Sequence, residues 1–364
     1  MNKLLVKIVY IFFFLVVIIA VVDFTTGFNP AFNLYHLGDA YDGLSGLTAK
    51  LNNDIAKKTE GSVSYYIKNI DDSELQLINY SLNNINGSVK SIKIYPAFLG
   101  VRKVDFEIER SDNSYVMDAY LTGAPIPEDR AEAVHLYHKV CVVLDTCIKG
   151  KLTEYEKEKR LHDYLIKNCE YSFGSEDNDN EYRAYGALVE GKAVCNGYAE
   201  AFSLLLTCAG IENEFVVGTA TADGKEENHA WNHVRINGEW YNVDSTWDDP
   251  VGENNIIIHV YFNVTDDILW KDHYWDKASY KKCNSTTWNY YNHEGLFFSD
   301  PENMIKKATE IATFKGAGLI ELGYYGFAFD PEKLQDMYTS ERVTSLSYMT
   351  LGSDDYNVIV IVVN

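Results

Sequence analysis

The chain has 364 residues, of which 46% are hydrophobic and 14% are aromatic. This length and composition are typical of a folded protein with one large or two modest domains, and they exclude a disordered chain. The net charge of -21, from 53 acidic and 32 basic residues, argues against nucleic acid as a partner, because its phosphates would be repelled over most of the surface.

Residues 1–24 have the pattern of a membrane anchor or signal segment. Lys3 and Lys7 flank the start of an apolar run that extends through Val22, close to the roughly 20 residues that a spanning helix needs. Lysines on the amino side place the remaining chain outside the cytoplasm. No Ala-x-Ala cleavage pattern follows Ala20, which favours an uncleaved anchor. We therefore predict a single-pass protein of the cell membrane with most of the chain extracellular; cleavage would make it secreted.

Residues 25–124 are predicted to form a β-rich module, although residues 25–61 show no clear element. Alternating or β-branched residues predict strands at Ser62–Ile67, Leu75–Leu82, Val89–Tyr95, Lys103–Glu109 and Tyr115–Leu121. Turns are predicted between strands at Asn86-Gly87, a good hairpin signal, and at Ser111–Ser114.

Two amphipathic helices are predicted next. Pro127–Asp129 starts a helix that extends to about Ile148, with apolar residues on one stripe. The second follows Thr153 and extends to about Lys167. Glu156 lies three residues after Thr153, and this spacing predicts a capping box.

An acidic stretch at residues 177–181 superficially resembles a calcium loop. Tyr182 stands where the sharp turn requires glycine, and Leu188 stands where the loop requires glutamate. Because the six cysteines show no CxxC spacing, a zinc site is not indicated either. We predict no metal and no cofactor.

Cys195 is the first candidate for chemistry. It falls at or just before the start of a helical pattern that Gly210 ends. Free amides and the positive dipole end favour a thiolate nucleophile there, and the same amides could form an oxyanion hole. Gly197 is expected to leave room for a substrate carbonyl. A buried structural cysteine is the alternative, which Cys208 illustrates deeper in the same helix.

A β-hairpin follows this helix. Asn237-Gly238 is a strong two-residue turn signal between His229–Ile236 and Glu239–Thr246. Period two places both His229 and His233 on the face of Asp244, as diagonal neighbours at about 7–8 Å. Either histidine could be a base that Asp244 orients towards a thiol. The hairpin geometry does not choose between them.

These segments resemble the transglutaminase-like superfamily, especially its bacterial extracellular branch. The resemblance covers roughly residues 125–290 and rests on Val194–Ala201, Gly210-Ile211, Val216–Gly218, His229–Asn232, Val234 and Trp240–Trp247, with further similarity at Tyr261–Asn263 and Asp272-His273. It implies that Cys195 is the nucleophile, His229 the base and Asp244 its orienting partner. It also implies an α+β, papain-like core in which the cysteine helix packs on an antiparallel sheet.

The same resemblance implies a thiol enzyme that forms a thioacyl intermediate on a protein or peptide amide, with cell-wall peptide among the candidate substrates. Water would release the acyl group as a peptidase or amidase does, and an amine would release it as an acyltransferase does. Hydrolysis is favoured because water is always available. A non-catalytic surface binding module that retains the fold is the alternative.

We therefore divide the chain into an anchor at 1–24, a β-rich module at 25–124, a catalytic domain at 125–300 and a C-terminal α/β extension at 301–364. In the extension, the pattern predicts a helix at Pro301–Lys315, a strand at Leu319–Phe329, a short helix at Pro331–Tyr338 and a final strand at Asn357–Val363.

Overall fold

The computed structural model describes residues 38–57, 60–76, 78, 82, 85–97, 99–174, 178–222, 224–250, 256–315, 318–334, 345–353 and 355–363. The chain divides into two compact units, Met1–Tyr115 and Val116–Asn364, and each is described by itself. The predicted anchor at 1–24 lies outside the described residues. Among the residues that are described, no helix is both long and apolar enough to cross a bilayer.

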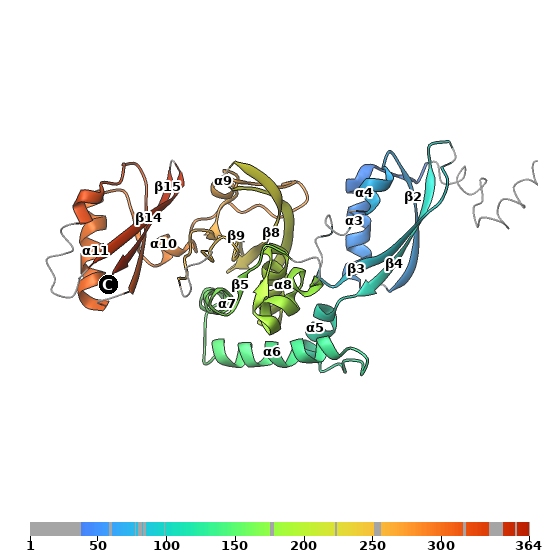
Figure 1. Cartoon of the computed structure of the whole chain (residues 1–364), viewed down its shortest axis with the longest axis horizontal. Helices are drawn as coiled ribbons and strands as arrows, with labels where there is room; N and C mark the ends of the chain where they lie inside the picture. Colours follow the sequence, from blue (N-terminus) through green and yellow to red (C-terminus); the bar gives the residue numbers. More distant parts are fainter. Residues whose placement is uncertain are drawn as a thin grey trace, which may run out of the picture. The chain divides into compact units, whose positions relative to one another are not determined.

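The first unit combines helices with a small sheet (Figure 1). Its elements are β1 (Tyr41–Asp42), α3 (Gly43–Ala56), β2 (Gly61–Lys68), α4 (Asp72–Gln76), β3 (Gly87–Ile94) and β4 (Arg102–Arg110). The strand order is β1-β2-β4-β3; β1 runs parallel to β2, and the other pairs are antiparallel. Leu47, Leu51 and Ile55, spaced by four residues on α3, belong to one buried core with Val104 and Phe106 of β4.

The strand predicted at Leu75–Leu82 is wrong where the structure describes it, because Leu75 lies in α4. Asp71 and Glu74 cap this helix reciprocally. The Glu74 amide donates to Asp71 Oδ1 and the Asp71 amide donates to Glu74 Oε2, both at 2.8 Å. The predicted turn at Asn86-Gly87 leads into β3, which pairs with β4.

The strand predicted at Tyr115–Leu121 is also wrong, because these residues lie in α5 (Asp112–Thr122). The hydroxyl of Ser111 accepts a hydrogen bond from the Ser114 amide at 3.2 Å, which caps the first turn of the helix. The polar residues that predicted a turn between strands therefore start a helix.

In the second unit, the predicted amphipathic pair of helices follows α5. These are α6 (Ala131–Cys147) and α7 (Glu154–Asn168). The helix α6 starts after a turn at residues 128–129, a few residues later than predicted. The capping box of α7 is confirmed: the Glu156 amide donates to Thr153 Oγ1 at 3.2 Å, and the Thr153 amide donates to Glu156 Oε2 at 2.8 Å.

An antiparallel sheet lies beside α8 (Cys195–Cys208) (Figure 1). The helix packs against β7 and β8 of this sheet. The strands are β7 (Asn213–Ala222), β8 (Lys225–Ile236), β9 (Glu239–Val243), β10 (Phe262–Val264) and β11 (His273–Tyr274), in the order β10-β9-β8-β7-β11. Between α7 and α8 lie the short parallel pair β5 (Glu170–Tyr171) and β6 (Lys192–Ala193) and two helical turns, Asp179–Tyr182 and Gly186–Glu190. This α+β arrangement confirms the predicted packing of the cysteine helix on an antiparallel sheet.

The predicted two-residue hairpin is confirmed. Ile236 pairs with Glu239 across the turn, and His233 pairs with Asn242. Asn237 and Gly238 both have positive φ, 49° and 92°, as a turn that matches the twist of its strands requires. The hairpin register therefore places His229, in the middle of β8, at the same level as the residues that follow β9.

The C-terminal part of the second unit is a helix on a small sheet. Its elements are α9 (Asp266–Leu269), α10 (Tyr290–His293), β12 (Phe297–Phe298), α11 (Pro301–Lys315), β13 (Gly318–Tyr324), β14 (Leu346–Ser353) and β15 (Tyr356–Val363), with the strand order β12-β13-β15-β14. The predicted helix matches α11, but the strand predicted to reach Phe329 ends at Tyr324. Alternate residues of β15 pack into two cores: Ile359 and Ile361 with α11, and Val358 and Val360 with the sheet that contains Trp231.

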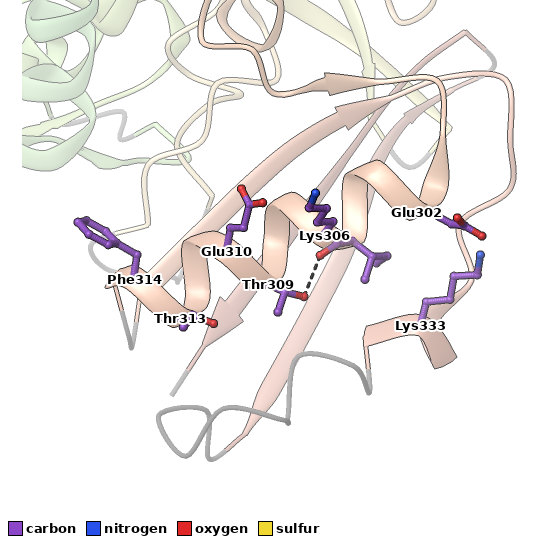
Figure 2. Close-up of a pocket in the computed structure, with 8 residues that line it drawn as sticks. Glu302, Lys306, Thr309, Glu310, Thr313, Phe314 and Lys333 are labelled. Atoms are coloured by element: carbon purple, nitrogen blue, oxygen red, sulfur yellow. Dashed lines mark hydrogen bonds between the residues drawn. The ribbon is translucent and has the colours of Figure 1, made fainter.

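The outer side of α11 borders an open hollow of about 1070 Å³ (Figure 2). Glu302, Lys306 and Glu310 contribute charges to it, and the ring of Phe314 is 87% exposed. None of the residues that line this hollow is a cysteine or a histidine. It therefore offers no nucleophile of the kind that the sequence predicts.

Replacing Thr153 with alanine tests the capping box. The change removes the hydroxyl that accepts the Glu156 amide, so we expect the free energy of unfolding to fall by about 1 kcal/mol in a urea titration followed by circular dichroism. Thr146→Ala, on the exposed face of α6, is the matched control and should leave the free energy of unfolding almost unchanged. Equal effects of the two changes would contradict the cap assignment.

Candidate functional site

Cys195 is the first residue of α8. The preceding residue, Val194, has an extended backbone and provides no side-chain cap, so the amides of the first turn point to the space beside the thiol. Cys195 is a free thiol and partly exposed, whereas Cys208 of the same helix is buried, and burial raises the pKa of Cys208 to about 12. Of these two thiols, only Cys195 is placed to meet a substrate.

Gly197 has a different role from the one expected. A Cβ atom at this position would lie 2.6 Å from the Glu181 carbonyl oxygen and 2.8 Å from the Ala193 Cβ. The expectation that Gly197 leaves room for a substrate is therefore wrong. The absence of a side chain lets the chain around residue 181 pack directly on the first turn of α8.

His229 and Asp244 form a direct pair. The Nε2 atom of His229 lies 2.7 Å from Oδ2 of Asp244, and both residues are buried. Burial lowers the pKa of His229, but the charge and hydrogen bond of Asp244, together with a hydrogen bond to Cys195, raise it to about 10. Because Nε2 faces Asp244, Nδ1 is the ring nitrogen that remains for the thiol.

The carboxylate of Asp244 is held from four directions. Its Oδ1 accepts hydrogen bonds from the amides of Thr246 at 2.9 Å and Trp247 at 3.2 Å. Its Oδ2 faces His229 and also lies 3.0 Å from Nε2 of His273. Burial raises the pKa of Asp244, but the charges and hydrogen bonds of the two histidines outweigh burial and hold the pKa well below its usual range. The carboxylate is therefore a fixed negative charge.

The helix and the hairpin are tied together by a buried amide. Nδ2 of Asn232, on β8, donates to the carbonyl oxygen of Ala199, on α8, at 3.0 Å. Both residues are almost inaccessible to solvent. This bond crosses between the element that carries His229 and the element that carries Cys195, so it limits sliding of one on the other.

The structure thus brings Cys195, His229 and Asp244 together and leaves His233 apart. The ring of His233 lies against Trp275 and Tyr280, and its Nδ1 is 3.7 Å from Oε2 of Glu214. The roles assigned to Cys195, His229 and Asp244 stay predictions. What the geometry shows is which of the two histidines meets Asp244.

Residues outside the predicted set complete the site. His273 bridges Asp244 and Asp272, with 2.5 Å between its Nδ1 and Oδ1 of Asp272. The ring of Trp247 packs against both histidines, 5.7 Å from His229 and 4.4 Å from His273. Asp272-His273 was similar to the bacterial relatives, but no local pattern could show that β11 pairs with β7 and carries His273 to Asp244.

Tyr171, on β5, is influenced by the charges of the site. Burial, followed by the charges of Cys195, Glu227 and Asp244, raises its pKa to about 12. Its hydroxyl therefore keeps its proton at neutral pH. Nothing in the sequence around Tyr171 distinguished it from the other tyrosines of the chain.

Part of the chain is similar to known proteins. Residues 143–245 match the family model of the Transglutaminase-like superfamily. Kyphoscoliosis peptidase from Homo sapiens is 25% identical over 145 residues, and the protein of the same name from Mus musculus is 24% identical over 145 residues. Each match covers 35% of this chain and 22% of the relative, so most of each relative has no counterpart here.

Among solved structures, similarity is found to one described as a cysteine protease candidate from Cytophaga hutchinsonii, with 14% identity over 55% of this chain and 73% of that chain and a TM-score of 0.27. The periplasmic domain of TgpA from Pseudomonas aeruginosa shows 17% identity over 40% of this chain and 54% of that chain, with a TM-score of 0.24. TM-scores this low do not support any assignment of activity.

The matched residues include α8 and the two hairpin strands β8 and β9, so the resemblance predicted from the sequence motifs is confirmed. Residues 143–245 of this chain are therefore similar to the core of the transglutaminase-like superfamily.

Proposed function

We propose that the chain is a membrane-tethered, extracytoplasmic thiol enzyme that forms a thioacyl intermediate on a protein or peptide amide. One observation carries this proposal: His229, whose pKa Asp244 and Cys195 together raise, is held by Asp244 at Nε2, and the thiol of Cys195 stands at the start of α8. A thiol, a histidine and an orienting carboxylate are the parts that nucleophilic catalysis by cysteine needs.

Before acylation, the thiol proton passes to His229 Nδ1, whose pKa of about 10 keeps the ring protonated, and the thiolate of Cys195 then attacks the carbonyl carbon of the amide. The carbon–sulfur bond forms, and the carbonyl oxygen becomes an oxyanion beside the first-turn amides of α8, which can donate to it. The carbon–nitrogen bond then breaks. The imidazolium of His229 gives its proton to the leaving amine, so the ring is neutral again.

In the second step, His229 takes a proton from the acyl acceptor, which attacks the thioester and displaces the Cys195 thiolate. Water as acceptor gives a carboxylate product, and a primary amine gives a new amide. We favour water, because it is always available and because the curated relatives carry the name peptidase. Transfer to an amine is the second outcome of the same chemistry.

The proposed location and partners rest on the sequence. The apolar run within residues 1–24 supports a tether in the cell membrane, with the catalytic domain outside the cytoplasm. The net charge of -21 disfavours nucleic acid and is compatible with a neutral or cationic protein or peptide, cell-wall peptide included.

A binding module that retains the fold without catalysis is the competing function. It requires neither a reactive thiol nor an oriented histidine. The convergence of Cys195, His229 and Asp244 argues against it, because a buried carboxylate with several donors is costly to keep without use.

The first prediction compares Cys195→Ala with the unaltered chain on peptide hydrolysis and on amine incorporation into a glutamine-containing substrate. Both rates should fall to background, because each product needs the same thioester. Cys141→Ala is the control, since Cys141 is also a partly exposed thiol, and it should retain activity. Activity that survives Cys195→Ala would remove the enzyme hypothesis in this form, and incorporation without hydrolysis would make the protein a transferase.

A second prediction concerns pH. The pKa of His229 is about 10, above its ordinary 6.5, so the protonated ring stabilises the fold fully below pH 6.5, and this stabilisation is lost as the pH rises through about 10. The rate of peptide hydrolysis should decline over the same alkaline range, because His229 must donate a proton to the leaving amine.

Asp244→Asn removes the charge that raises the pKa of His229. We expect kcat/KM to fall by about 10²–10⁴-fold, and the alkaline limb of the pH profile to move to lower pH. Asp267→Asn, at an exposed carboxylate in α9, is the control and should leave the limb in place. An alkaline limb that stays unchanged in Asp244→Asn would show that His229 and Asp244 are not coupled in the working enzyme.

A further inference from the structure

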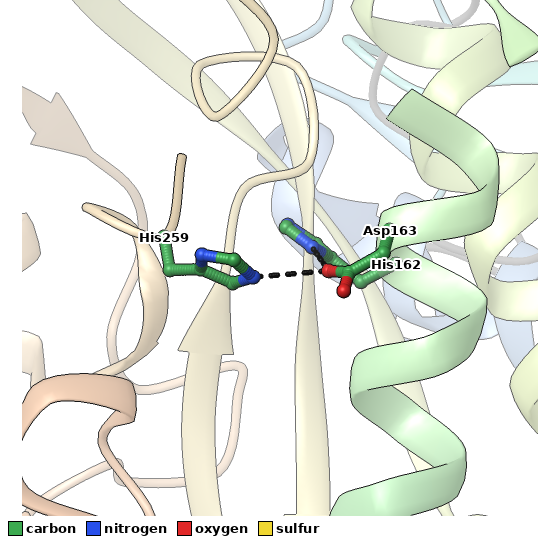
Figure 3. Close-up of side chains that lie close together, drawn as sticks. All are labelled: His162, Asp163 and His259. Atoms are coloured by element: carbon green, nitrogen blue, oxygen red, sulfur yellow. Dashed lines mark hydrogen bonds and ion pairs between the residues drawn. The ribbon is translucent and has the colours of Figure 1, made fainter. Parts of the chain in front are cut away.

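A second group of histidines and carboxylates lies in the same unit and includes none of Cys195, His229 and Asp244. His162 and Asp163 come from α7, and His259 comes from the segment before β10 (Figure 3). Oδ1 of Asp163 is 3.2 Å from Nδ1 of His162 and 2.9 Å from Nε2 of His259. One donor atom from each of these three residues lies within 4.8 Å of the other two. Two ring nitrogens and one carboxylate oxygen therefore converge on one point.

The outward-facing nitrogens of both rings also meet carboxylates. Nε2 of His162 lies 3.2 Å from Oδ2 of Asp248, and Nδ1 of His259 lies 3.1 Å from Oε1 of Glu321. A neutral imidazole has only one N–H, and an ionised carboxylate only accepts. For all four contacts to be ordinary hydrogen bonds, each ring would therefore need to carry two protons, and two adjacent cationic rings would be buried 5.4 Å apart.

A divalent metal ion removes this difficulty. If each ring donates its single N–H outward, to Asp248 or to Glu321, its inner nitrogen presents a lone pair. Metal-binding histidines usually have this arrangement, in which a carboxylate behind the ring fixes the tautomer. We propose that Nδ1 of His162, Nε2 of His259 and Oδ1 of Asp163 bind a divalent transition-metal ion of the zinc class.

The donor set selects the kind of ion. Two imidazole nitrogens and one carboxylate oxygen suit Zn²⁺, which is commonly four-coordinate, with water in the remaining position. Calcium and magnesium prefer oxygen ligands alone, so they fit less well. The carboxylates of Asp163, Asp248 and Glu321 surround the point with negative charge, and Lys159 neutralises part of it by contact with Oδ2 of Asp163 at 2.6 Å.

The surroundings would both admit and hold an ion. His162 is fully buried and His259 is nearly so, whereas the side chain of Asp163 is 28% exposed and gives access from solvent. Tyr290 stacks on His259 at 3.9 Å, and Phe262 lies edge-on against His162 at 4.9 Å. Tyr291 donates its hydroxyl to Glu321 at 2.9 Å, which orients the carboxylate behind His259.

The consequence of binding would be structural. Asp163 and His162 belong to α7, His259 precedes β10, and Glu321 belongs to β13 in the C-terminal sheet. An ion held by the first three, with Glu321 behind, would fasten the C-terminal sheet to the domain that carries Cys195. We therefore expect the ion to raise thermal stability, without taking part in the thioester chemistry.

The test uses the full-length chain, purified in mild detergent and freed of metal with a chelator. Titration with Zn²⁺ should show one tight site per chain and should raise the midpoint of thermal unfolding. Co²⁺ in place of Zn²⁺ should give the visible absorption of a tetrahedral site without the intense near-ultraviolet band of a thiolate ligand. Two other sets of potential ligands lie in the described part of the chain: His233, Asp266 and Cys283, and the set of His229, Asp244 and His273 beside Cys195. A spectrum without a thiolate band distinguishes the proposed site from binding that involves either cysteine.

Variants assign the ligands. Asp163→Asn keeps the shape of the side chain but should abolish tight binding, and Glu321→Gln, which alters the carboxylate behind His259, should weaken Zn²⁺ binding by about 10–100-fold. Asp145→Asn, at an exposed position of α6, is the matched control and should bind like the unaltered chain. Cys195→Ala and Cys283→Ala should also bind normally, which separates this site from the other two groups of potential ligands.

Three results would overturn the proposal: no Zn²⁺ binding by the folded, metal-free chain, unchanged affinity in Asp163→Asn, or a thiolate band with Co²⁺. Circular dichroism verifies that each variant is folded. If Asp163→Asn does not fold, the affinity of Glu321→Gln and the Co²⁺ spectrum of the unaltered chain decide the question.

Discussion

The buried carboxylate of Asp244 is the constraint on which the candidate site depends. Removing an ionised carboxylate from water costs several kcal/mol unless its oxygens are fully paired. Here two backbone amides and two histidines supply the pairs. Meeting this requirement fixes the turn after β9, the position of β11 and the orientation of His229 at once. The same bonds that stabilise the carboxylate therefore orient the base.

A second requirement is that the thiol and the histidine stay in register. Cys195 begins a helix and His229 belongs to a strand, so both sit on rigid elements, which hold a site more accurately than loops do. The bond from Asn232 to the Ala199 carbonyl joins these two elements in a buried, low-dielectric interior. Gly197 contributes by its missing side chain, which allows the neighbouring backbone to pack against the start of α8.

Local patterns predicted the parts of this protein that local interactions determine. The hairpin at Asn237-Gly238, the capping box at Thr153 and the helix that begins at Cys195 each depend on residues a few positions apart. The hairpin left His229 and His233 equivalent, and the choice of His229 came from the family resemblance. The twist of the hairpin and the direction of the side chain bring His229 to Asp244. Neither can be derived from the spacing of residues in the sequence.

The errors have equally specific causes. Ser111 was interpreted as a turn residue, whereas its side chain caps a helix, and both uses draw on the same polar residue types. His273 reaches Asp244 only because β11 pairs with β7, about fifty residues earlier in the chain, and no local pattern carries that information. The group around Asp163 likewise joins α7 to residues near 259 and 321, so its ligand-like geometry could not be seen in the sequence.

The central claim is that Cys195 is a thiol activated by its helix position and by His229. Competitive labelling with iodoacetamide, followed by mass spectrometry of the cysteine peptides, measures this directly. The account predicts that Cys195 alkylates near neutral pH well before Cys141, which is also a partly exposed thiol, and that His229→Ala slows Cys195 alone. Equal labelling rates for Cys195 and Cys141, unchanged by His229→Ala, would contradict it.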